Sequence, residues 1–528
     1  MKHNQMGSLL PEIQRHSRRY FLLPRIILVG MVAVFSASIL PSAQAAELKV
    51  RLGGAVNILD PAFWQSDQES HIIHAIFPKL IEFKSTAKGG IWEWELQLAE
   101  SIEQIDDTTI NFQLKPGFTW TNGYGDITAE DVKYSYERYL DEDLASPIAG
   151  DWVTLKEVEV TGKYSGVIHL NDPFAPLWTS TLPYLAGSIV SKKATEEAGG
   201  KFTTDPIATG GPYKIGKWVP KERIELVAHD GWKGKKPAYD KLTLLIISDV
   251  KAAEIAFEAG ELDFANIALS SVRVMQENMP ANSTLEIRPS LDYLWLGMNV
   301  SNGALQDVRV RQAIKMAVDV DAILEGAYFG VPDRATGFIA PGLIGYNAMS
   351  PAPRDVAGAK KLLDEAGVSG LTLELEVNNE TDRVTSAQII QANLAEVGID
   401  MQINVLDGGS FWSLGDTKGD KMQLTLKMYT NPPDPAWATQ WFLAEQKGIW
   451  NWEWFDNPEF EKLHAQGVAE SSSSVRAGIY QEMQGLMDSS AAFLWLMHPP
   501  VVLLYRDTVS PGLYPNGRPK YMDFAPAN

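Results

Sequence analysis

Short strand-like runs alternate with helical stretches along most of this 528-residue chain. The clearest case is a strand predicted at residues 371–377, followed by a helix at 386–398 and a second strand at 399–406, which together form a βαβ unit. Similar strand and helix pairs are predicted at 241–263 and 291–318. Because the chain is too long for one ordinary core, this alternation predicts an α/β protein with more than one compact unit.

Residues 1–45 have the pattern of a secretory signal peptide. Arginines precede an apolar run from Ile26 to Leu40, and the sequence Ala-Gln-Ala at 43–45 supplies a cleavage site. The apolar run is shorter than the roughly 20 residues that span a bilayer, so cleavage is favoured over a retained anchor. The stretch SRRYFLL resembles a twin-arginine export signal with Leu23 in place of the usual Lys. A general secretory signal is the alternative export route.

Charge and cysteine content narrow the function classes. The chain has a formal net charge of −20 and no cysteine, and its first 45 residues carry more basic than acidic groups. The exported part is therefore even more acidic, and such a surface repels nucleic acid and anionic lipid. The lack of cysteine excludes disulfides, a thiol nucleophile and a lipid-modified N-terminal cysteine. We expect a free protein that is not lipid-anchored.

Residues 429–442, YTNPPDPAWATQWF, combine rigid turn chemistry with aromatic surface. Three prolines between 432 and 435 fix φ and hold the backbone still before any ligand arrives. Trp437 and Trp441 are four residues apart, and they share a face if a helix starts after the last proline. This stretch is predicted to be a loop that faces a ligand.

No motif in the chain makes a positive case for an enzyme, a cofactor or a metal. Gly211, Gly216 and Lys217 have the spacing of a phosphate-binding loop, but Trp218 stands where the motif needs a hydroxyl, which favours a turn that leads into a strand. The signatures H-E-x-x-H, G-x-S-x-G and G-x-G-x-x-G are missing. We expect no enzyme and no cofactor, and a secreted hydrolase with unrecognised carboxylates is the less favoured alternative.

Two histidines at helical spacing are the only candidates for a metal pair. His71 and His74 are three residues apart, but no cysteine or carboxylate nearby completes a site. A structural role in an apolar helix is favoured for both.

Six segments of the chain resemble segments of one protein family, and they occur in the same order as in that family. The longest is LAESIEQIDDTTINFQLKPGFTWTNGYGDITAEDVKYSYER at 98–138, and the others lie at 208–218, 256–263, 307–319, 359–367 and 389–400. They resemble the periplasmic solute-binding proteins of peptide, nickel and opine ABC importers, family 5, to which the dipeptide- and oligopeptide-binding proteins belong.

The resemblance implies a two-lobed periplasmic binding protein fold of class II, with mixed sheets, a hinge and an extra subdomain inserted in the first lobe. The expected divisions are lobe I at 46–295 with the insertion at about 85–205, lobe II at 296–497, and a C-terminal segment at 498–528 that returns to lobe I. It also implies a periplasmic monomer that closes on a ligand and then docks on ABC permease subunits driven by a separate ATPase.

The ligand class is harder to predict, because the resemblance is incomplete where the ligand would bind. In the dipeptide-binding branch, an Asp three residues before an Asp-Pro pair holds the ammonium of the peptide. Here the pair is Asp434-Pro435, and Asn431 stands at the earlier position. An amide does not neutralise a desolvated ammonium. Val377 also stands where that branch has an Arg for the carboxylate, and Arg383 replaces it only if the loop is shifted.

Aromatic residues are the other candidate ligand contacts, since they stack on sugar rings or line side-chain pockets. Ordinary packing is the favoured alternative for Trp450, Trp452 and Trp454. An oligopeptide or peptide-like ligand is preferred, with an oligosaccharide or sugar conjugate as the alternative. The predicted ligand-binding residues are Asn431, Asp434, Trp437, Trp441, Trp412 and Arg383.

Overall fold

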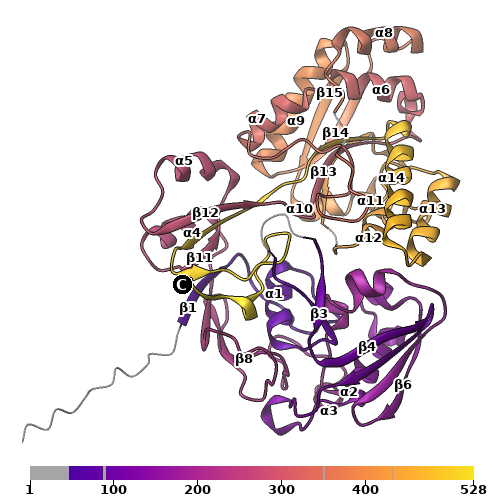
Figure 1. The fold of residues 1–528 in the computed structure, drawn as a ribbon. Coiled ribbons are helices and arrows are strands. Elements are labelled where there is room, and N and C mark those ends of the chain that lie inside the picture. Colours follow the sequence, from indigo (N-terminus) through magenta and orange to yellow (C-terminus); the bar gives the residue numbers. More distant parts are fainter. Residues whose placement is uncertain (1–46, 87–90, 349–350, 431, 528) are drawn as a thin grey trace, which may run out of the picture. The chain divides into compact units, whose positions relative to one another are not determined.

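The computed structural model describes residues 47–86, 91–348, 351–430 and 432–527. Two large mixed sheets organise these residues, one of seven strands and one of five (Figure 1). We call the part built on the seven-stranded sheet and its smaller companion sheet lobe I, and the part built on the five-stranded sheet lobe II. The α/β character expected from the alternating pattern is confirmed.

The seven-stranded sheet of lobe I combines strands from both ends of the chain. Its order is β12-β18-β11-β1-β10-β9-β8, and only the pairs that β1 makes with β10 and β11 are parallel. Because β18 lies between β11 and β12, the C-terminal segment completes the sheet that the N-terminal half begins. The strands are β1 (Glu47–Leu52), β8 (Tyr213–Val219), β9 (Arg223–Ala228), β10 (Lys241–Ile246), β11 (Phe264–Asn266), β12 (Ser283–Arg288) and β18 (Val501–Arg506).

An antiparallel four-stranded sheet, in the order β4-β5-β7-β6, shares one hydrophobic core with the seven-stranded sheet. Its strands are β4 (Ala99–Asp106), β5 (Thr109–Leu114), β6 (Leu155–Gly162) and β7 (Ser165–Leu170). The helices of lobe I are α1 (Asp67–Ile76), α2 (Ala129–Glu137), α3 (Lys192–Glu197), α4 (Val250–Glu258) and α5 (Val272–Glu277), with a π-helical turn η5 (Leu177–Thr181). Two small hairpin sheets pair β2 (Ile81–Phe83) with β3 (Trp94–Leu96) and β19 (Val509–Ser510) with β20 (Ala525–Pro526).

The five-stranded sheet of lobe II has the order β15-β14-β16-β13-β17 and a separate core on each face. The alternation of β13 explains this, because Leu294 and Leu296 enter one core while Tyr293 and Trp295 enter the other. The strands are β13 (Tyr293–Met298), β14 (Thr372–Asn378), β15 (Asp400–Leu406), β16 (Leu424–Tyr429) and β17 (Phe493–Met497).

Helices cover both faces of this sheet (Figure 1). One face packs against α6 (Val308–Ala317), α7 (Val320–Tyr328), α8 (Val356–Ala366) and α9 (Thr381–Glu396). The other packs against α12 (Pro435–Gln440), α13 (Pro458–Ala469) and α14 (Ser473–Ser490). The short helices α10 (Gly408–Trp412) and α11 (Leu414–Thr417) contribute to a small third core.

The predicted βαβ unit is confirmed as β14, α9 and β15, with the two strands parallel and in register from Thr372 opposite Asp400. The helix starts at Thr381, earlier than the predicted residue 386. Its first turn contains Thr381, Asp382 and Arg383, which are polar, so apolar periodicity does not mark this turn. Arg383 therefore lies on a helix and not on a loop.

Two segments cross between the sheets. Residues 289–292 connect β12 to β13, and residues 498–500 connect β17 to β18. His498 Nδ1 lies 3.0 Å from the carbonyl oxygen of Asp292, so a hydrogen bond ties one crossing segment to the other.

Candidate ligand-binding site

The stretch 429–442 is predicted to be a loop, but it is not a loop throughout, because the short helix α12 occupies Pro435–Gln440 within it. Asp434 is its N-cap, and its Oδ1 accepts a hydrogen bond from Ala436 N at 2.9 Å. Proline suits the first helical position, since it has no N–H to leave unsatisfied. The rigid turn thus serves to start a short helix at the edge of lobe II.

The Asp434 carboxylate is fully buried and holds a buried arginine. Arg476 on α14 donates to it through both terminal nitrogens, at 2.9 and 2.8 Å. Burial lowers the pKa of the Arg476 guanidinium, but the charges of Asp434 and Tyr480 and the hydrogen bonds to both together outweigh burial and raise it. The Thr179 hydroxyl of lobe I also donates to Asp434 Oδ2. Asp434 therefore has partners for both oxygens and offers little to a ligand in this structure.

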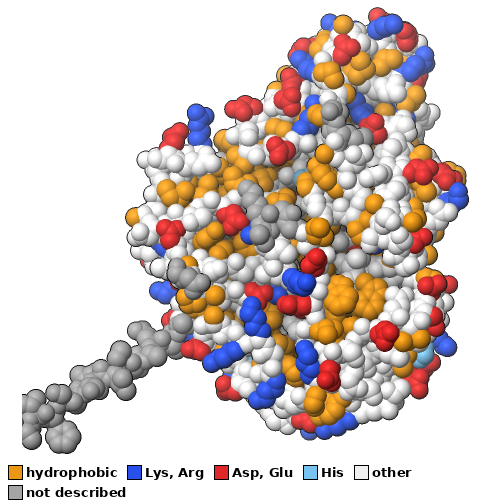
Figure 2. Space-filling view, in the orientation of Figure 1, with side chains coloured by type: hydrophobic (Ala, Val, Ile, Leu, Met, Phe, Trp, Pro, Cys, Tyr) orange, Lys and Arg blue, Asp and Glu red, His pale blue; other side chains and the backbone are white. Residues whose placement is uncertain are grey.

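Trp437 contacts lobe I directly. Its Nε1 donates to Ser180 Oγ at 2.8 Å, and the nearby backbone N of Ala175 donates to Val468 O at 2.8 Å. These bonds and the Thr179 contact join α12 and its neighbours to η5 and the residues before it. An open cavity of about 520 Å³ lies beside them, lined in part by Trp94 and Trp178. Figure 2 shows hydrophobic side chains gathered near β3 on the face in view.

The other predicted tryptophans form an aromatic cluster with Tyr429 at the end of β16. Trp412 stacks on Tyr429 with ring centres 6.0 Å apart, and Trp441 and Trp450 lie 5.5 Å apart. Trp412 is 44% exposed and Trp450 is 39% exposed, so the cluster presents aromatic surface to solvent. In the same series Trp452 is buried at 1% exposure, as the packing alternative expects.

The two positions compared for carboxylate binding, Val377 and Arg383, are both buried but differ in their partners. Val377 is buried in the core of lobe II. Arg383 is also buried, and it donates to Tyr328 Oη at 2.5 Å and to Asp382 Oδ2 at 3.1 Å. Asn431 lies outside the described residues. The arginine is thus already held by lobe II residues.

A polar cluster that the sequence did not predict surrounds Arg518, in the C-terminal segment. Its Nη2 lies 2.9 Å from Asp67 Oδ1 on α1 and donates to Thr430 Oγ1, at 3.3 Å, next to Asn431. Its Nη1 donates to Tyr184 Oη at 3.2 Å. Burial lowers the pKa of Arg518, but the charges of Asp67, Tyr184 and Asp292 and a hydrogen bond to Tyr184 together outweigh burial and raise it. Arg518 therefore brings together residues of lobe I and the end of β16 in lobe II.

Asp292, in the first crossing segment, belongs to the same neighbourhood. Burial raises the pKa of its carboxyl, and the charge of Arg518, a hydrogen bond from Thr430 and the charge of Arg383 oppose that rise. Its Oδ1 is buried and has no hydrogen-bond partner within the described part of the chain. Carboxylate oxygens of this kind are costly to bury, and an unsatisfied one in a native fold calls for an explanation.

Two further buried atoms near Arg518 lack hydrogen-bond partners within the same described ranges, namely Trp64 Nε1 and His71 Nε2. The Trp64 ring meets the Tyr184 ring edge to face at 6.2 Å, and the charge of Arg518 lowers the pKa of His71. Burial is the larger cause of that shift, which takes the pKa of His71 to about 4. The cluster thus offers one acceptor and two ring nitrogens that nothing in the described chain satisfies.

Sequence reasoning missed Asp67, Tyr184, Asp292 and Arg518 because they are far apart in the chain and carry no motif. The weak indication was the C-terminal segment, which the resemblance returned to lobe I. In α1, His71 is half-buried and His74 is buried, and His74 Nδ1 contacts Lys79 Nζ at 2.9 Å. Among the described residues, no group of three or more His, Cys, Asp or Glu side chains is placed to hold a metal ion.

The helices of the described ranges include none with the length and apolar character that crossing a membrane requires.

Comparison with known proteins gives relatives over nearly the whole chain. The glutathione-binding protein GsiB of Shigella dysenteriae serotype 1 is 23% identical over 497 residues, which cover 92% of this chain and 93% of that protein. The structure of HbpA2 from Haemophilus parasuis matches with a TM-score of 0.80 and 24% identity, over 91% of this chain and all of that one.

A third relative is the periplasmic binding protein DppA from Helicobacter pylori, solved with the peptide STSA. It matches with a TM-score of 0.76 and 23% identity over 92% of this chain and 99% of that one. These structural likenesses confirm the two-lobed fold. The sequence profile of the bacterial extracellular solute-binding proteins, family 5 Middle, matches residues 93–450, more than half of the chain. The chain therefore belongs to the family 5 bacterial extracellular solute-binding proteins.

Proposed function

We propose that this protein captures a peptide or peptide-like solute between its two lobes and delivers it to an ABC importer. Family membership supports the general role, since these are solute-binding proteins that work with ABC permeases. The relatives support the ligand class, because one is named for glutathione, a short peptide, and another was solved with the peptide STSA.

The observation that carries the ligand assignment is the buried, partnerless Asp292 Oδ1 near Arg518. A ligand with an ammonium group supplies the missing partner of this carboxylate oxygen, and the carboxylate of a zwitterionic ligand adds a further partner to the Arg518 guanidinium, which Asp67 already holds. Asp292 is also close enough to Arg518 and Arg383 for their charges to act on its pKa. Asp292 thereby provides the acidic group that Asn431 does not, and it does so from a crossing segment and not from the proline-rich loop.

The predicted contacts take different roles in this proposal. Asn431, Trp437 and Trp441 flank the ligand. Asp434 and Arg383 support the site without direct contact with the ligand, because each is buried and bound to another residue of the protein, Arg476 and Tyr328 respectively. A ligand that bridges Asp292, Arg518 and the Thr430 region binds both lobes at once, so it favours the closed arrangement over an open one.

Residues 1–45 are proposed to be the signal peptide, which leaves a periplasmic monomer without a lipid anchor, exported by the twin-arginine or the general route. The proposed divisions keep an insertion at about 85–205 and a returning segment at 498–528, and the proposed boundary between lobe I and lobe II moves from 295/296 to the crossing segment 289–292, because β13 begins at Tyr293 and belongs to the sheet of lobe II.

An oligosaccharide or sugar conjugate is the second candidate ligand. The exposed faces of Trp412 and Trp450 favour it, because sugar rings stack on exposed tryptophan. The Asp292 carboxylate favours the peptide, since a neutral sugar gives its buried Oδ1 no charged partner.

A thermal-shift screen of the purified mature protein separates these ligands. Dipeptides, longer peptides including glutathione, and oligosaccharides are each added in excess. We expect saturable stabilisation by a peptide class, and a peptide blocked at both termini should stabilise much less than its free form. Stabilisation by oligosaccharides alone overturns the peptide assignment, and chemical turnover of any hit overturns the binding role.

A further inference from the structure

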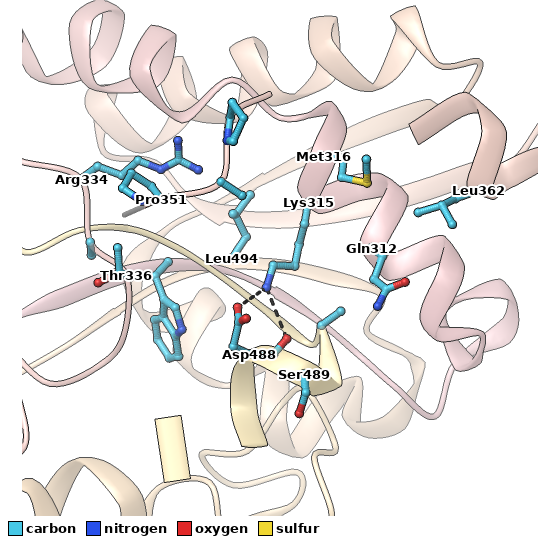
Figure 3. Close-up of a pocket in the computed structure, with 15 residues that line it drawn as sticks. Gln312, Lys315, Met316, Arg334, Thr336, Pro351, Leu362, Asp488, Ser489 and Leu494 are labelled. Atoms are coloured by element: carbon cyan, nitrogen blue, oxygen red, sulfur yellow. Dashed lines mark hydrogen bonds and ion pairs between the residues drawn. The ribbon is translucent and has the colours of Figure 1, made fainter. Parts of the chain in front are cut away.

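Lobe II contains a cavity of about 410 Å³ that is separate from the Arg518 cluster (Figure 3). Buried side chains of Ala335, Ala491, Leu494 and Trp495 line it on the side of β17, and Met316 and Leu362 line it from α6 and α8. Exposed residues 351–353 lie at its rim. Its volume lies in the range of roughly 300–1,000 Å³ that is usual for small-molecule sites, and its lining mixes these apolar side chains with polar and charged ones.

Two cations and one acid line this cavity. Lys315 on α6 is neutralised, because its Nζ lies 2.6 Å from Asp488 Oδ1. The Arg334 side chain has no hydrogen bond or ion pair with any described residue, and Figure 3 shows it on the opposite side of the cavity from Asp488. The cavity therefore has one unpaired positive charge, in a chain whose net charge is −20.

The backbone fixes the place of this arginine. Ala335 N donates to Leu496 O at 3.0 Å, and the backbone of Arg334 forms an isolated antiparallel β-bridge with Met497 on β17. Burial lowers the pKa of the Arg334 guanidinium, while the charges of Asp321 and Asp319 oppose this without forming an ion pair. A partly desolvated guanidinium without a partner is costly, and a carboxylate that it binds through two nitrogens relieves that cost.

We propose that this cavity binds a small molecule with a single carboxylate on an apolar body. The carboxylate pairs with Arg334, and the apolar part lies against Leu494, Met316 and Leu362. The cavity binds only one anionic group, because Asp488 already neutralises Lys315 and repels a second anionic group. The site is independent of the peptide site proposed above, so either can exist without the other.

Octanoate is a suitable probe, with octanamide as its neutral counterpart. In calorimetric titration of the mature protein, we expect saturable binding of octanoate and at least tenfold weaker binding of octanamide. The variant Arg334→Gln should lose affinity for octanoate by about tenfold or more, and Arg334→Lys should keep part of it. Arg273→Gln is the matched control, because Arg273 is 86% exposed in lobe I, and it should bind octanoate as the natural protein does.

A second variant guards against misfolding of the first. Ala352→Trp fills the rim of the cavity from an exposed position and should also abolish octanoate binding. Asp292→Asn should leave octanoate binding unchanged, which separates this cavity from the peptide site. The proposal is overturned if the dissociation constant of octanoate is above about 5 mM, which corresponds to a binding free energy weaker than about −3 kcal/mol. Equal binding by Arg334→Gln, equal binding of octanamide, or loss of octanoate binding in Asp292→Asn also overturns it.

Discussion

Two acids near the lobe boundary, the fully buried Asp434 and the half-buried Asp292, differ in whether their carboxylate oxygens have hydrogen-bond partners. Asp434 accepts from both terminal nitrogens of Arg476, from Ala436 N and from Thr179, and it is completely buried. Asp292 has a buried oxygen with no partner in the described chain. A buried polar group with every bond made serves the fold, whereas one left incomplete in a native structure points to a missing ligand. The acid in the recognisable Asp-Pro frame is thus the structural one, and the functional acid lies elsewhere.

The largest expected effect is the loss of stability when Asp434, whose hydrogen bonds are all made, is replaced. Asp434→Ala leaves Arg476 buried without its partner, which should lower the free energy of unfolding by about 3–5 kcal/mol. Denaturant unfolding measures this loss. Asp456→Ala is the control, because it removes an ion pair with Lys447 in which Asp456 is 56% exposed, and it should cost at most about 1 kcal/mol. Similar losses in the two variants would remove the structural role given to Asp434.

The reverse result is expected for Asp292. Asp292→Asn removes a carboxylate that burial already disfavours, so stability should stay the same or rise. Binding of the free peptide should weaken by about tenfold to a hundredfold, which corresponds to the 1.5–3 kcal/mol of a hydrogen bond to a charged group. Calorimetry measures the affinity, and Asp333→Asn, at an exposed position of lobe II, is the control. If Asp292→Asn binds peptide as before, the contrast between the two acids fails.

A smaller effect on binding is expected from Trp437, which lies on α12 three residues after Asp434. Trp437→Ala removes both the indole and its hydrogen bond to Ser180, and we expect about tenfold weaker peptide binding, or about 1.4 kcal/mol. Trp437→Phe keeps most of the ring and loses only the hydrogen bond, so its loss should be smaller. Unchanged affinity in Trp437→Ala would remove this residue from the site.

A smaller effect is expected in the pH dependence of stability. Burial lowers the pKa of His498 from 6.5 to about 4, so the folded protein holds this ring neutral. The unfolded chain binds the proton first as the pH falls, and stability is lost between about pH 6.5 and 4. His498→Gln should reduce this loss by up to about one proton per molecule, seen as a shallower slope of unfolding free energy against pH. The pKa values of His71 and His464 are also lowered to about 4, so these two histidines should produce the slope that remains in His498→Gln. An unchanged slope would show that His498 is not held neutral.

Local structure was largely predictable because local patterns cause it. The apolar periodicity of the βαβ unit predicted elements that the structure contains, whereas the loop predicted at 429–442 includes the short helix α12. The partners of the buried acids were not predictable, since Arg476 is 42 residues from Asp434 and the fold alone brings them together. The same holds for Arg518, which meets Asp67 and Thr430 only because the C-terminal segment returns to lobe I.

The most direct test is a crystal structure of the mature protein with a peptide from the thermal-shift screen. We expect the peptide ammonium within about 3 Å of Asp292 Oδ1, the usual hydrogen-bond distance. We also expect its carboxylate to face Arg518 or Arg383, with the Asp434–Arg476 pair unchanged. A peptide whose ammonium displaces Arg476 from Asp434, while Asp292 stays without a partner, would contradict the roles given to the two acids.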